Sequence, residues 1–326
     1  MPSAADVLTV FLLVLVGVLI WFALSPFETL GWWAGWFGDR IYWPSEPEIK
    51  HPHEGEINAY LVFFSGIGRA TGEPLSYRER EFLRILDESL PNAVVIDYIF
   101  PYATNNLALT EQPWLKSFWR FALRSKMGDV PVAGYLINIR NIAQILTSAD
   151  RRYGPIFNQG VAEVIVSGLL RHDYPYRRQP HAARPPVFLI GYSGAGQMAL
   201  GASAYVKEWL DCPLSVISLG GVFFSDPSLL EIDHLYHLVG SRDVIERIGI
   251  VAPGRWPILR TSEWNRAVKA GTVTRVEMGP MRHTGSGGYL DAKSMLPNGE
   301  KFVDHTVGVV GGIVAEELAK SHLAPP

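Results

Sequence analysis

Residues 187–202 read VFLIGYSGAGQMALGA and predict a strand, a sharp turn and a helix, with a serine at the apex of the turn. The apolar run Val187–Ile190 suits a buried strand, and Gly196–Leu210 begins with small residues and continues as a helix. Such a turn needs small residues around Ser193, because the helix must approach the strand closely. Glycines meet this need two positions before and one position after the serine. Strand–turn–helix serine turns usually read Gly-x-Ser-x-Gly. Here Ala195 stands at the last position of that pattern, and alanine is the next smallest residue after glycine.

From residue 57 onward the chain alternates short apolar runs with amphipathic helical patterns. The other runs that predict strands are Ala59–Phe64, Ala93–Phe100, Leu214–Leu219, Leu235–Val239 and Val273–Met278. The other predicted helices are Ser76–Leu90, Gly160–Arg171 and His305–Lys320. This alternation is typical of βαβ units, whose parallel strands are buried on both faces. The sequence therefore predicts an α/β fold with a mainly parallel central sheet flanked by helices.

Residues 102–153 interrupt this alternation. They follow a predicted strand and carry four aromatic side chains between positions 114 and 121, then a second apolar stretch at Tyr135–Leu146. Ligand sites in open parallel sheets lie at the carboxyl ends of the strands. We therefore interpret the segment as a helical lid, or cap, over that edge of the sheet. A structural elaboration packed beside the sheet is the alternative.

The serine turn and the alternation around it resemble the α/β-hydrolase superfamily over residues 57–320. The resemblance implies the α/β-hydrolase fold and a nucleophilic serine, here Ser193, on the turn after a central strand. It also implies that the acid and the histidine of a catalytic triad follow the serine in that order along the chain.

Two later turns carry residues of the required types. Asp243 follows the predicted strand Leu235–Val239, and His283 follows Val273–Met278. The resemblance implies that His283 accepts the proton of the serine, while Asp243 holds the imidazole in the right tautomer and stabilises its charge. Asp226 remains an alternative acid, because it follows an earlier strand and some members of the superfamily place their acid there.

The same resemblance implies an oxyanion hole made of backbone N–H groups, which stabilises the negative charge that develops on the acyl oxygen. One donor is expected from the residue after the serine, here Gly194. The other is expected from the loop after the earlier strand, which reads Ser65-Gly66-Ile67-Gly68. Within this loop Ile67 is the first choice and Gly66 the second, and the glycines let the backbone bend toward a substrate.

The amino-terminal segment Val7–Leu24 reads VLTVFLLVLVGVLIWFAL and contains no charged residue. As a helix it is roughly 27 Å long at about 1.5 Å per residue, close to the thickness of a bilayer core. No Lys or Arg precedes it, which favours a single-pass membrane anchor over a cleaved signal peptide. Arg40 and Lys50 follow it, and positive charge on that side favours a cytoplasmic catalytic domain.

Half of the ten tryptophans lie in a short stretch, namely Trp21, Trp32, Trp33, Trp36 and Trp43. Indole rings favour the headgroup level of a bilayer, so an interfacial segment is expected there; packing of these rings on the soluble domain is the alternative. His51 and His53 stand near two glutamates, but the neighbouring prolines and glycine favour a solvated linker over a metal site. The predicted division is an anchor at 1–25, the interfacial segment and linker at 26–56, and the α/β-hydrolase domain at 57–326.

Composition excludes several functional classes. The formal net charge is −3 and no dense Lys/Arg stripe is present, so no nucleic-acid partner is expected. Cys212 is the single cysteine, which rules out a disulfide within one chain and leaves a buried apolar role as its expected one. No cofactor or metal is expected. The stretch Gly66–Gly72 lacks the third glycine of a dinucleotide loop, and no phosphate-binding Gly-Lys-Ser/Thr signature occurs.

These features predict a serine hydrolase that cleaves a carboxylic ester, thioester or amide through an acyl-enzyme on Ser193. The apolar anchor and the tryptophans favour an amphiphilic or lipid-like acyl substrate taken from or near the bilayer. An acyltransferase with the same triad is one alternative, and a non-catalytic membrane-tethered binding module is another.

Overall fold

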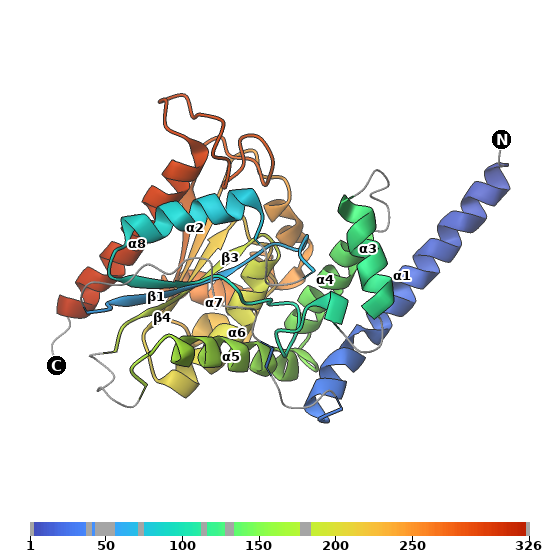
Figure 1. Cartoon of the computed structure of the whole chain (residues 1–326), viewed down its shortest axis with the longest axis horizontal. Coiled ribbons are helices and arrows are strands. Elements are labelled where there is room, and N and C mark those ends of the chain that lie inside the picture. Colours follow the sequence, from blue (N-terminus) through green and yellow to red (C-terminus); the bar gives the residue numbers. More distant parts are fainter. Residues whose placement is uncertain are drawn as a thin grey trace.

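A computed structural model describes residues 3–36, 41–42, 56–70, 75–111, 116–127, 134–176 and 184–323. Its centre is a six-stranded sheet in the order β2-β1-β3-β4-β5-β6, in which every neighbouring pair is parallel (Figure 1). The strands are β1 (Ala59–Phe64), β2 (Ala93–Ile96), β3 (Val187–Tyr192), β4 (Leu214–Leu219), β5 (His234–Val239) and β6 (Val273–Glu277). The predicted α/β class and parallel sheet are confirmed.

The strand order contains one reversal of direction. The chain runs from β1 outward to β2 at one edge, returns to β3 on the other side of β1, and then proceeds strand by strand to β6. The neighbouring strands at this reversal are β1 and β3. The loops that leave them at the carboxyl edge of the sheet therefore lead away from each other. Such a switch point is where open α/β sheets place their ligand sites.

Helices cover both faces of the sheet (Figure 1). The helices of the main domain are α2 (Tyr77–Ser89), α5 (Gly154–Arg171), α6 (Ala195–Leu210), α7 (Glu263–Ala270) and α8 (Phe302–Leu323). Alternate side chains of β1 enter opposite cores: Val62 packs with α5 and α6, whereas Leu61 packs with α2 and α8. This alternation is the period of two that a strand buried on both faces requires.

Some elements differ from those expected. β2 ends at Ile96 rather than Phe100, because the backbone turns away from β1 and the Phe100 N–H donates to the Asn106 side chain at 2.6 Å. α5 begins at Gly154, six positions early, with Pro155 in the first turn, where its missing N–H costs nothing. The eight-residue helix α7 was not predicted, since it is shorter than the pattern by which a helix is recognised.

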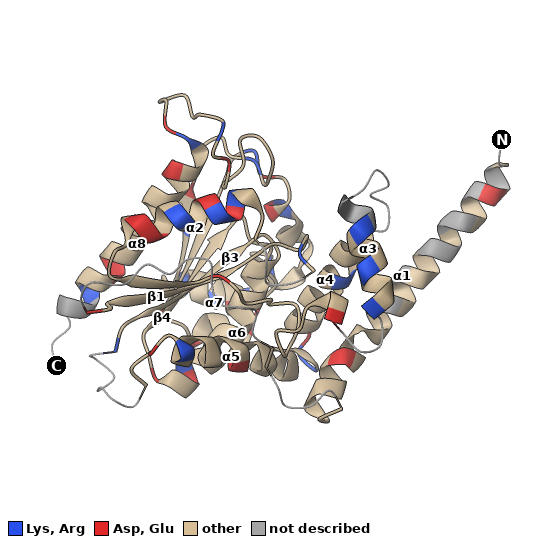
Figure 2. Ribbon diagram, viewed as in Figure 1, with Lys and Arg blue, Asp and Glu red and all other residues tan. Residues whose placement is uncertain are grey.

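The first helix, α1 (Ala4–Trp33), is continuous through Pro26 and extends past the boundary expected at residue 25. Figure 2 shows few charged residues along this helix. Its earlier turns expose apolar side chains at Leu8, Leu12, Leu15, Val16, Leu19, Ile20 and Leu24. Among the described residues it is the one helix long and apolar enough to cross a membrane, over the 19 residues Leu15–Trp33, a test that a signal sequence also passes. Trp33 and Trp36 are exposed, while Trp43 and the linker histidines lie outside the described residues.

The segment between β2 and α5 contains two helices, α3 (Lys116–Met127) and α4 (Gly134–Ala149), which pack against each other. α4 also contacts α1 on one side and α6 on the other, so it joins the amino-terminal helix to the main domain (Figure 1). The helical content expected for this insertion is present. Its action as a lid stays a prediction.

Two glycines provide a matched test of helix packing. A Cβ at Gly201 in α6 would lie 2.6–2.8 Å from the amide of buried Asn158 on α5, whereas nothing lies within 4 Å of one at Gly308 in α8. We expect Gly201→Ala to lower the free energy of unfolding by about 1–3 kcal/mol through overpacking. Gly308→Ala should raise it by about 0.5–1 kcal/mol, because alanine is the better helix former. Urea unfolding of the full chain, followed by circular dichroism, measures both, and equal effects would contradict close α5–α6 packing.

Candidate active site

Ser193 occupies the tight turn between β3 and α6. Its backbone has a positive φ of 59°, a left-handed conformation that costs a non-glycine residue roughly 1–2 kcal/mol. A Cβ at Gly191 would lie 2.6 Å from the Cα of Gly196 and 2.7 Å from the Ala195 carbonyl oxygen, so no side chain fits there. The strand and the helix thus approach closely at Gly191 and Gly196. Ala195, the first residue of α6, is buried in the core.

The structure brings together the three side chains expected to form a triad. The Nε2 atom of His283 lies 2.7 Å from Ser193 Oγ. On the other edge of the ring, Nδ1 lies 2.9 Å and 3.0 Å from the two carboxylate oxygens of Asp243. The serine follows β3, the aspartate follows β5 and the histidine follows β6, so all three stand at the carboxyl edge of the sheet.

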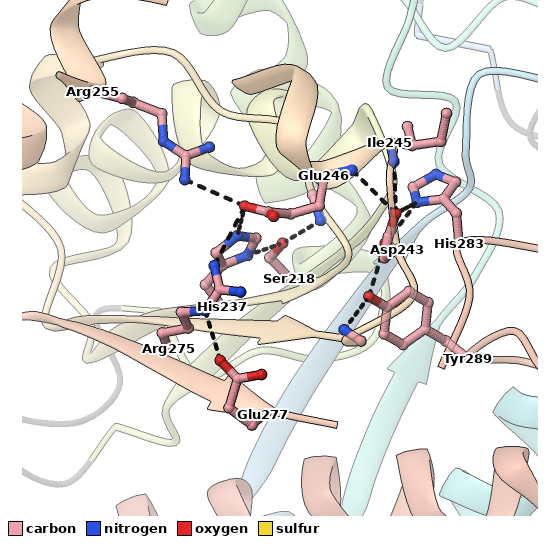
Figure 3. A network of polar contacts seen from close by, with 12 residues as sticks. Ser218, His237, Asp243, Ile245, Glu246, Arg255, Arg275, Glu277, His283 and Tyr289 are labelled. Atoms are coloured by element: carbon pink, nitrogen blue, oxygen red, sulfur yellow. Dashed lines mark hydrogen bonds and ion pairs between the residues drawn. The ribbon is translucent and has the colours of Figure 1, made fainter. Parts of the chain in front are cut away.

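The Asp243 carboxylate is fully buried and has several donors besides His283 (Figure 3). The backbone N–H groups of Ile245 and Glu246 donate to Oδ1 at 2.9 and 3.1 Å, and the Tyr289 hydroxyl donates to Oδ2 at 2.8 Å. Burial acts to raise the pKa of Asp243, but the hydrogen bonds and the charge of the imidazole outweigh it and lower the pKa. Asp243 is therefore held as a carboxylate facing the imidazole.

Tyr289 is a site residue that the sequence analysis missed. Its hydroxyl donates to Asp243 and accepts from the Gly240 N–H at 2.8 Å, and burial raises the pKa of Tyr289. Room for this contact comes from Gly220, whose φ is +58° and whose Cβ, if present, would lie 2.5 Å from Asp243 Oδ2. The sequence offers only a lone tyrosine directly after the glycine-rich stretch 285–288, which does not indicate a contact with an aspartate.

A second buried polar network is connected to Asp243 through Glu246 (Figure 3). The backbone N–H of Glu246 donates to Asp243. The side-chain carboxylate of Glu246 is in turn contacted by His237 Nε2 at 3.0 Å and by the Arg255 guanidinium at 3.3 Å. His237 Nδ1 in turn contacts Ser218 Oγ at 3.2 Å. Burial lowers the pKa of His237, although the neighbouring carboxylate opposes the shift. This histidine is structural, since it lies between two buried partners and away from the serine turn.

Tyr192 supports the histidine from the other side. Its hydroxyl donates to the His283 carbonyl oxygen at 2.7 Å, and the two rings stack with centroids 5.8 Å apart and planes inclined at 21°. Burial raises the pKa of Tyr192 to about 12. Because Tyr192 precedes the serine directly, one short stretch of chain positions both the hydroxyl and the imidazole.

Asp226, the alternative acid, lies elsewhere. Its two carboxylate oxygens accept hydrogen bonds from Gln197 Nε2 at 2.8 Å and from the Ser228 N–H at 2.9 Å, where it caps a short 3-10 helix, Pro227–Leu230. Burial raises its pKa. The geometry thus joins Asp243, and not Asp226, to His283.

The residues expected to form an oxyanion hole are also adjacent to the serine. A Cβ at Gly66 would lie 3.5 Å from Ser193 Cβ, and one at Gly194 would lie 2.9 Å from the Ile67 side chain. Within the described part of the chain, the backbone N–H groups of Ile67 and Gly194 have no acceptor. These two unpaired N–H groups belong to residues that contact each other next to Ser193. Among the same described residues, no group of three His, Cys, Asp or Glu side chains is placed to hold a metal ion.

Replacement of Tyr289 by phenylalanine tests the support of the acid. Tyr289→Phe leaves the Gly240 N–H without an acceptor and removes one of the donors to the Asp243 carboxylate, so we expect a loss of about 1–3 kcal/mol of stability at neutral pH. The folded-state pKa of Asp243 lies below its ordinary value. The charge-dependent part of the loss is therefore complete above about pH 4 and disappears as the pH falls through the folded-state pKa. Urea unfolding at several pH values measures it, with exposed Tyr77→Phe as control. Equal stability of both variants at neutral pH would refute this role.

Comparisons with known proteins give remote structural likeness only. No family model and no curated protein matches the sequence. A dienelactone hydrolase-like promiscuous phosphotriesterase from metagenomic libraries is 11% identical, with a TM-score of 0.43 over 81% of this chain and 88% of that one. A dienelactone hydrolase from Anabaena variabilis is 14% identical, with a TM-score of 0.41 over 81% and 86%. A puromycin-hydrolyzing peptidase from Mycobacterium tuberculosis is 15% identical, with a TM-score of 0.37 over 84% of this chain and 36% of that one.

The sheet order and three turns of this chain identify its fold. The order in which the chain adds its six parallel strands reverses once, where the chain returns from β2 to place β3 on the other side of β1, and a strained serine turn follows β3. An aspartate and a histidine in contact with each other follow β5 and β6. With this sheet order and these three turns, the chain has the α/β-hydrolase fold.

Proposed function

We propose that this protein is a serine hydrolase that cleaves a carboxylic ester, thioester or amide through an acyl-enzyme on Ser193. One observation carries the proposal: His283 contacts the serine hydroxyl at 2.7 Å with Nε2 while its Nδ1 is held by the Asp243 carboxylate at 2.9 Å. A histidine between a hydroxyl and a buried carboxylate is the arrangement that turns serine into a nucleophile at neutral pH.

The proposed reaction uses each group in turn. His283 Nε2 takes the proton of Ser193 as Oγ attacks the acyl carbon, and Asp243 stabilises the imidazolium that forms. The N–H groups of Ile67 and Gly194 donate to the acyl oxygen as it becomes negative; one such donor is worth about 10²–10³ in rate. The imidazolium then protonates the leaving alcohol, thiol or amine. A water molecule, deprotonated by the same histidine, attacks the acyl-enzyme, and Ser193 recovers its proton as the carboxylic acid leaves.

The surface beside the acid supports an amphiphilic substrate. Residues 244–259, which we call the apolar rim, begin directly after Asp243 and expose Val244, Ile245, Ile248, Ile250, Val251, Trp256, Ile258 and Leu259. The exposed charged residues between positions 242 and 260 are all arginines, because Asp243 and Glu246 are buried. Exposed apolar side chains interspersed with arginines fit an anionic bilayer surface. With the apolar helix α1, this rim supports an acyl substrate taken from the membrane.

Loss of the serine hydroxyl tests the chemistry. We expect Ser193→Ala to abolish covalent labelling by a fluorophosphonate probe and to lower hydrolysis of p-nitrophenyl butyrate by about 10⁴-fold or more, since the nucleophile is removed. Ser89→Ala, at the end of α2 and away from the site, should behave as wild type. Unchanged labelling of the Ser193→Ala protein would remove Ser193 from the role. A well-folded wild type that neither labels nor hydrolyses would favour a non-catalytic binding module.

The apolar rim has its own test. Ile258 is 81% exposed, so Ile258→Asp should fold normally and hydrolyse a short, soluble ester at the wild-type rate. Hydrolysis of a long-chain acyl ester embedded in lipid nanodiscs should fall about tenfold, because a buried Ile side chain contributes roughly 1.5–3 kcal/mol. Leu170→Asp on α5, which changes an apolar surface residue elsewhere, is the control. Equal loss of both activities, or of neither, would exclude a role of the rim in reaching bilayer substrates.

A further inference from the structure

The last turns of α1 carry polar side chains that contact α4. Ser25 Oγ lies 3.1 Å from Thr147 Oγ1. One turn further, the Glu28 carboxylate forms an ion pair with the guanidinium of Arg140 and accepts a hydrogen bond from Gln144 Nε2 at 3.1 Å. These contacts join α1 to α4, which packs against the serine turn: a Cβ at Gly194 would lie 2.3 Å from the Ile145 side chain of α4. An apolar helix that served only as an anchor would not need them.

Arg140 is the centre of this contact region. Its side chain is 2% exposed, and burial lowers its pKa while the charge of Glu28 raises it. A buried guanidinium is costly unless it is paired and hydrogen-bonded. Besides Glu28, the Nη1 atom of Arg140 donates to the Tyr102 carbonyl oxygen and to the Asn141 side-chain oxygen at 3.2 Å. Glu28 therefore neutralises a cation that organises two further residues.

Those two residues hold the loop that carries the expected oxyanion donor. The Nδ2 atom of Asn141 donates to the Ile67 carbonyl oxygen at 2.8 Å and to the Arg69 carbonyl oxygen at 2.7 Å. The Tyr102 hydroxyl donates to the Ser65 carbonyl oxygen at 3.1 Å.

These hydrogen bonds hold the two peptide units that flank the peptide unit joining Gly66 to Ile67. The carbonyl oxygens of Ser65 and Ile67 belong to the peptide units before and after the unit that joins Gly66 to Ile67. The N–H of Ile67 lies in that middle unit. A guanidinium has only hydrogen-bond donors, so Arg140 can bind the Asn141 side chain only through its oxygen. The Asn141 NH₂ group is therefore directed toward the loop.

We propose that Glu28 and Arg140 are positioning residues of the active site, and that α1 is thereby part of the catalytic unit. Glu28 holds the Arg140 guanidinium, Arg140 orients Asn141 and the backbone at Tyr102, and these two residues set the position of the Ile67 N–H. The inference rests on the proposed function, since it assigns a role to a donor in that reaction. An oxyanion donor must meet its acceptor within a few tenths of an ångström, so displacement of the loop is expected to slow catalysis without removing a catalytic group.

The effect should appear in kcat rather than in KM. Removing one oxyanion donor costs about 10²–10³ in rate, and displacing it should cost less. For p-nitrophenyl butyrate hydrolysis we expect Arg140→Met to lower kcat about 30-fold and Glu28→Gln about tenfold. KM should stay within about threefold in both, because the donor acts chiefly on the transition state. All rates are measured on the full chain in detergent and divided by the active sites counted with a fluorophosphonate, so unfolded protein does not contribute.

A double-mutant cycle tests whether Glu28 acts through Arg140. In the Arg140→Met background, Glu28→Gln should change kcat less than about twofold, because the group through which it acts is gone. Ser25→Ala is the matched control: it removes another α1–α4 contact that does not involve Arg140, and it should keep the wild-type kcat. If Arg140→Met does not fold, Arg140→Lys, which keeps the charge but not the forked donors, should still lower kcat.

The outcomes separate this inference from the proposed function. Active wild type together with unchanged kcat per active site in the Glu28 and Arg140 variants would overturn the inference and leave the hydrolase intact. Additive effects of the two substitutions, or an equal loss in Ser25→Ala, would also overturn it, because they would indicate general loosening of α1. An inactive wild type that fails to label would instead overturn the proposed function.

Discussion

The close approach of α6 to β3 is the constraint on which the rest of the site depends. The helix can start directly after the strand because Gly191 has no side chain: a Cβ there would lie 2.6 Å from the Cα of Gly196. Ser193 is then forced into a left-handed conformation at the carboxyl edge of the sheet, beside the loop that follows β1. The strain is balanced by close packing around the turn, and a hydroxyl in this position is presented to whatever reaches that edge.

Residues that carry strong local signals could be predicted from the sequence. The strands β1, β3 and β4 could be recognised because each is a short apolar run, which is what a parallel strand buried on both faces requires. The edge strand β6 gives a weaker signal, because it reads VTRVE and has no buried residue. Asp243 and His283 could be placed because their turns directly follow such strands. Their contact with each other follows from the sheet order, which brings consecutive carboxyl ends to one edge. The catalytic roles of these residues, and of Ile67 and Gly194, stay proposals.

Residues that act through long-range contacts could not be predicted in this way. Tyr289 reaches Asp243 from a loop 46 positions later, and no pattern in the sequence singles out one tyrosine in an irregular segment. The same holds for Glu28 and Arg140, which are 112 positions apart. A single acid near the end of an apolar helix predicts only a boundary. Its partner is identified only when α4 is seen to pack against α1.

The lone cysteine has a practical consequence for studying how α1 and the domain are arranged. Cys212 is buried, and burial raises its pKa to about 12, so at neutral pH it is an inaccessible, protonated thiol. A second cysteine introduced at an exposed position would be the one reactive thiol of the chain. Spectroscopic labels can thus be attached singly, or as a chosen pair for distance measurements, without first replacing a native residue.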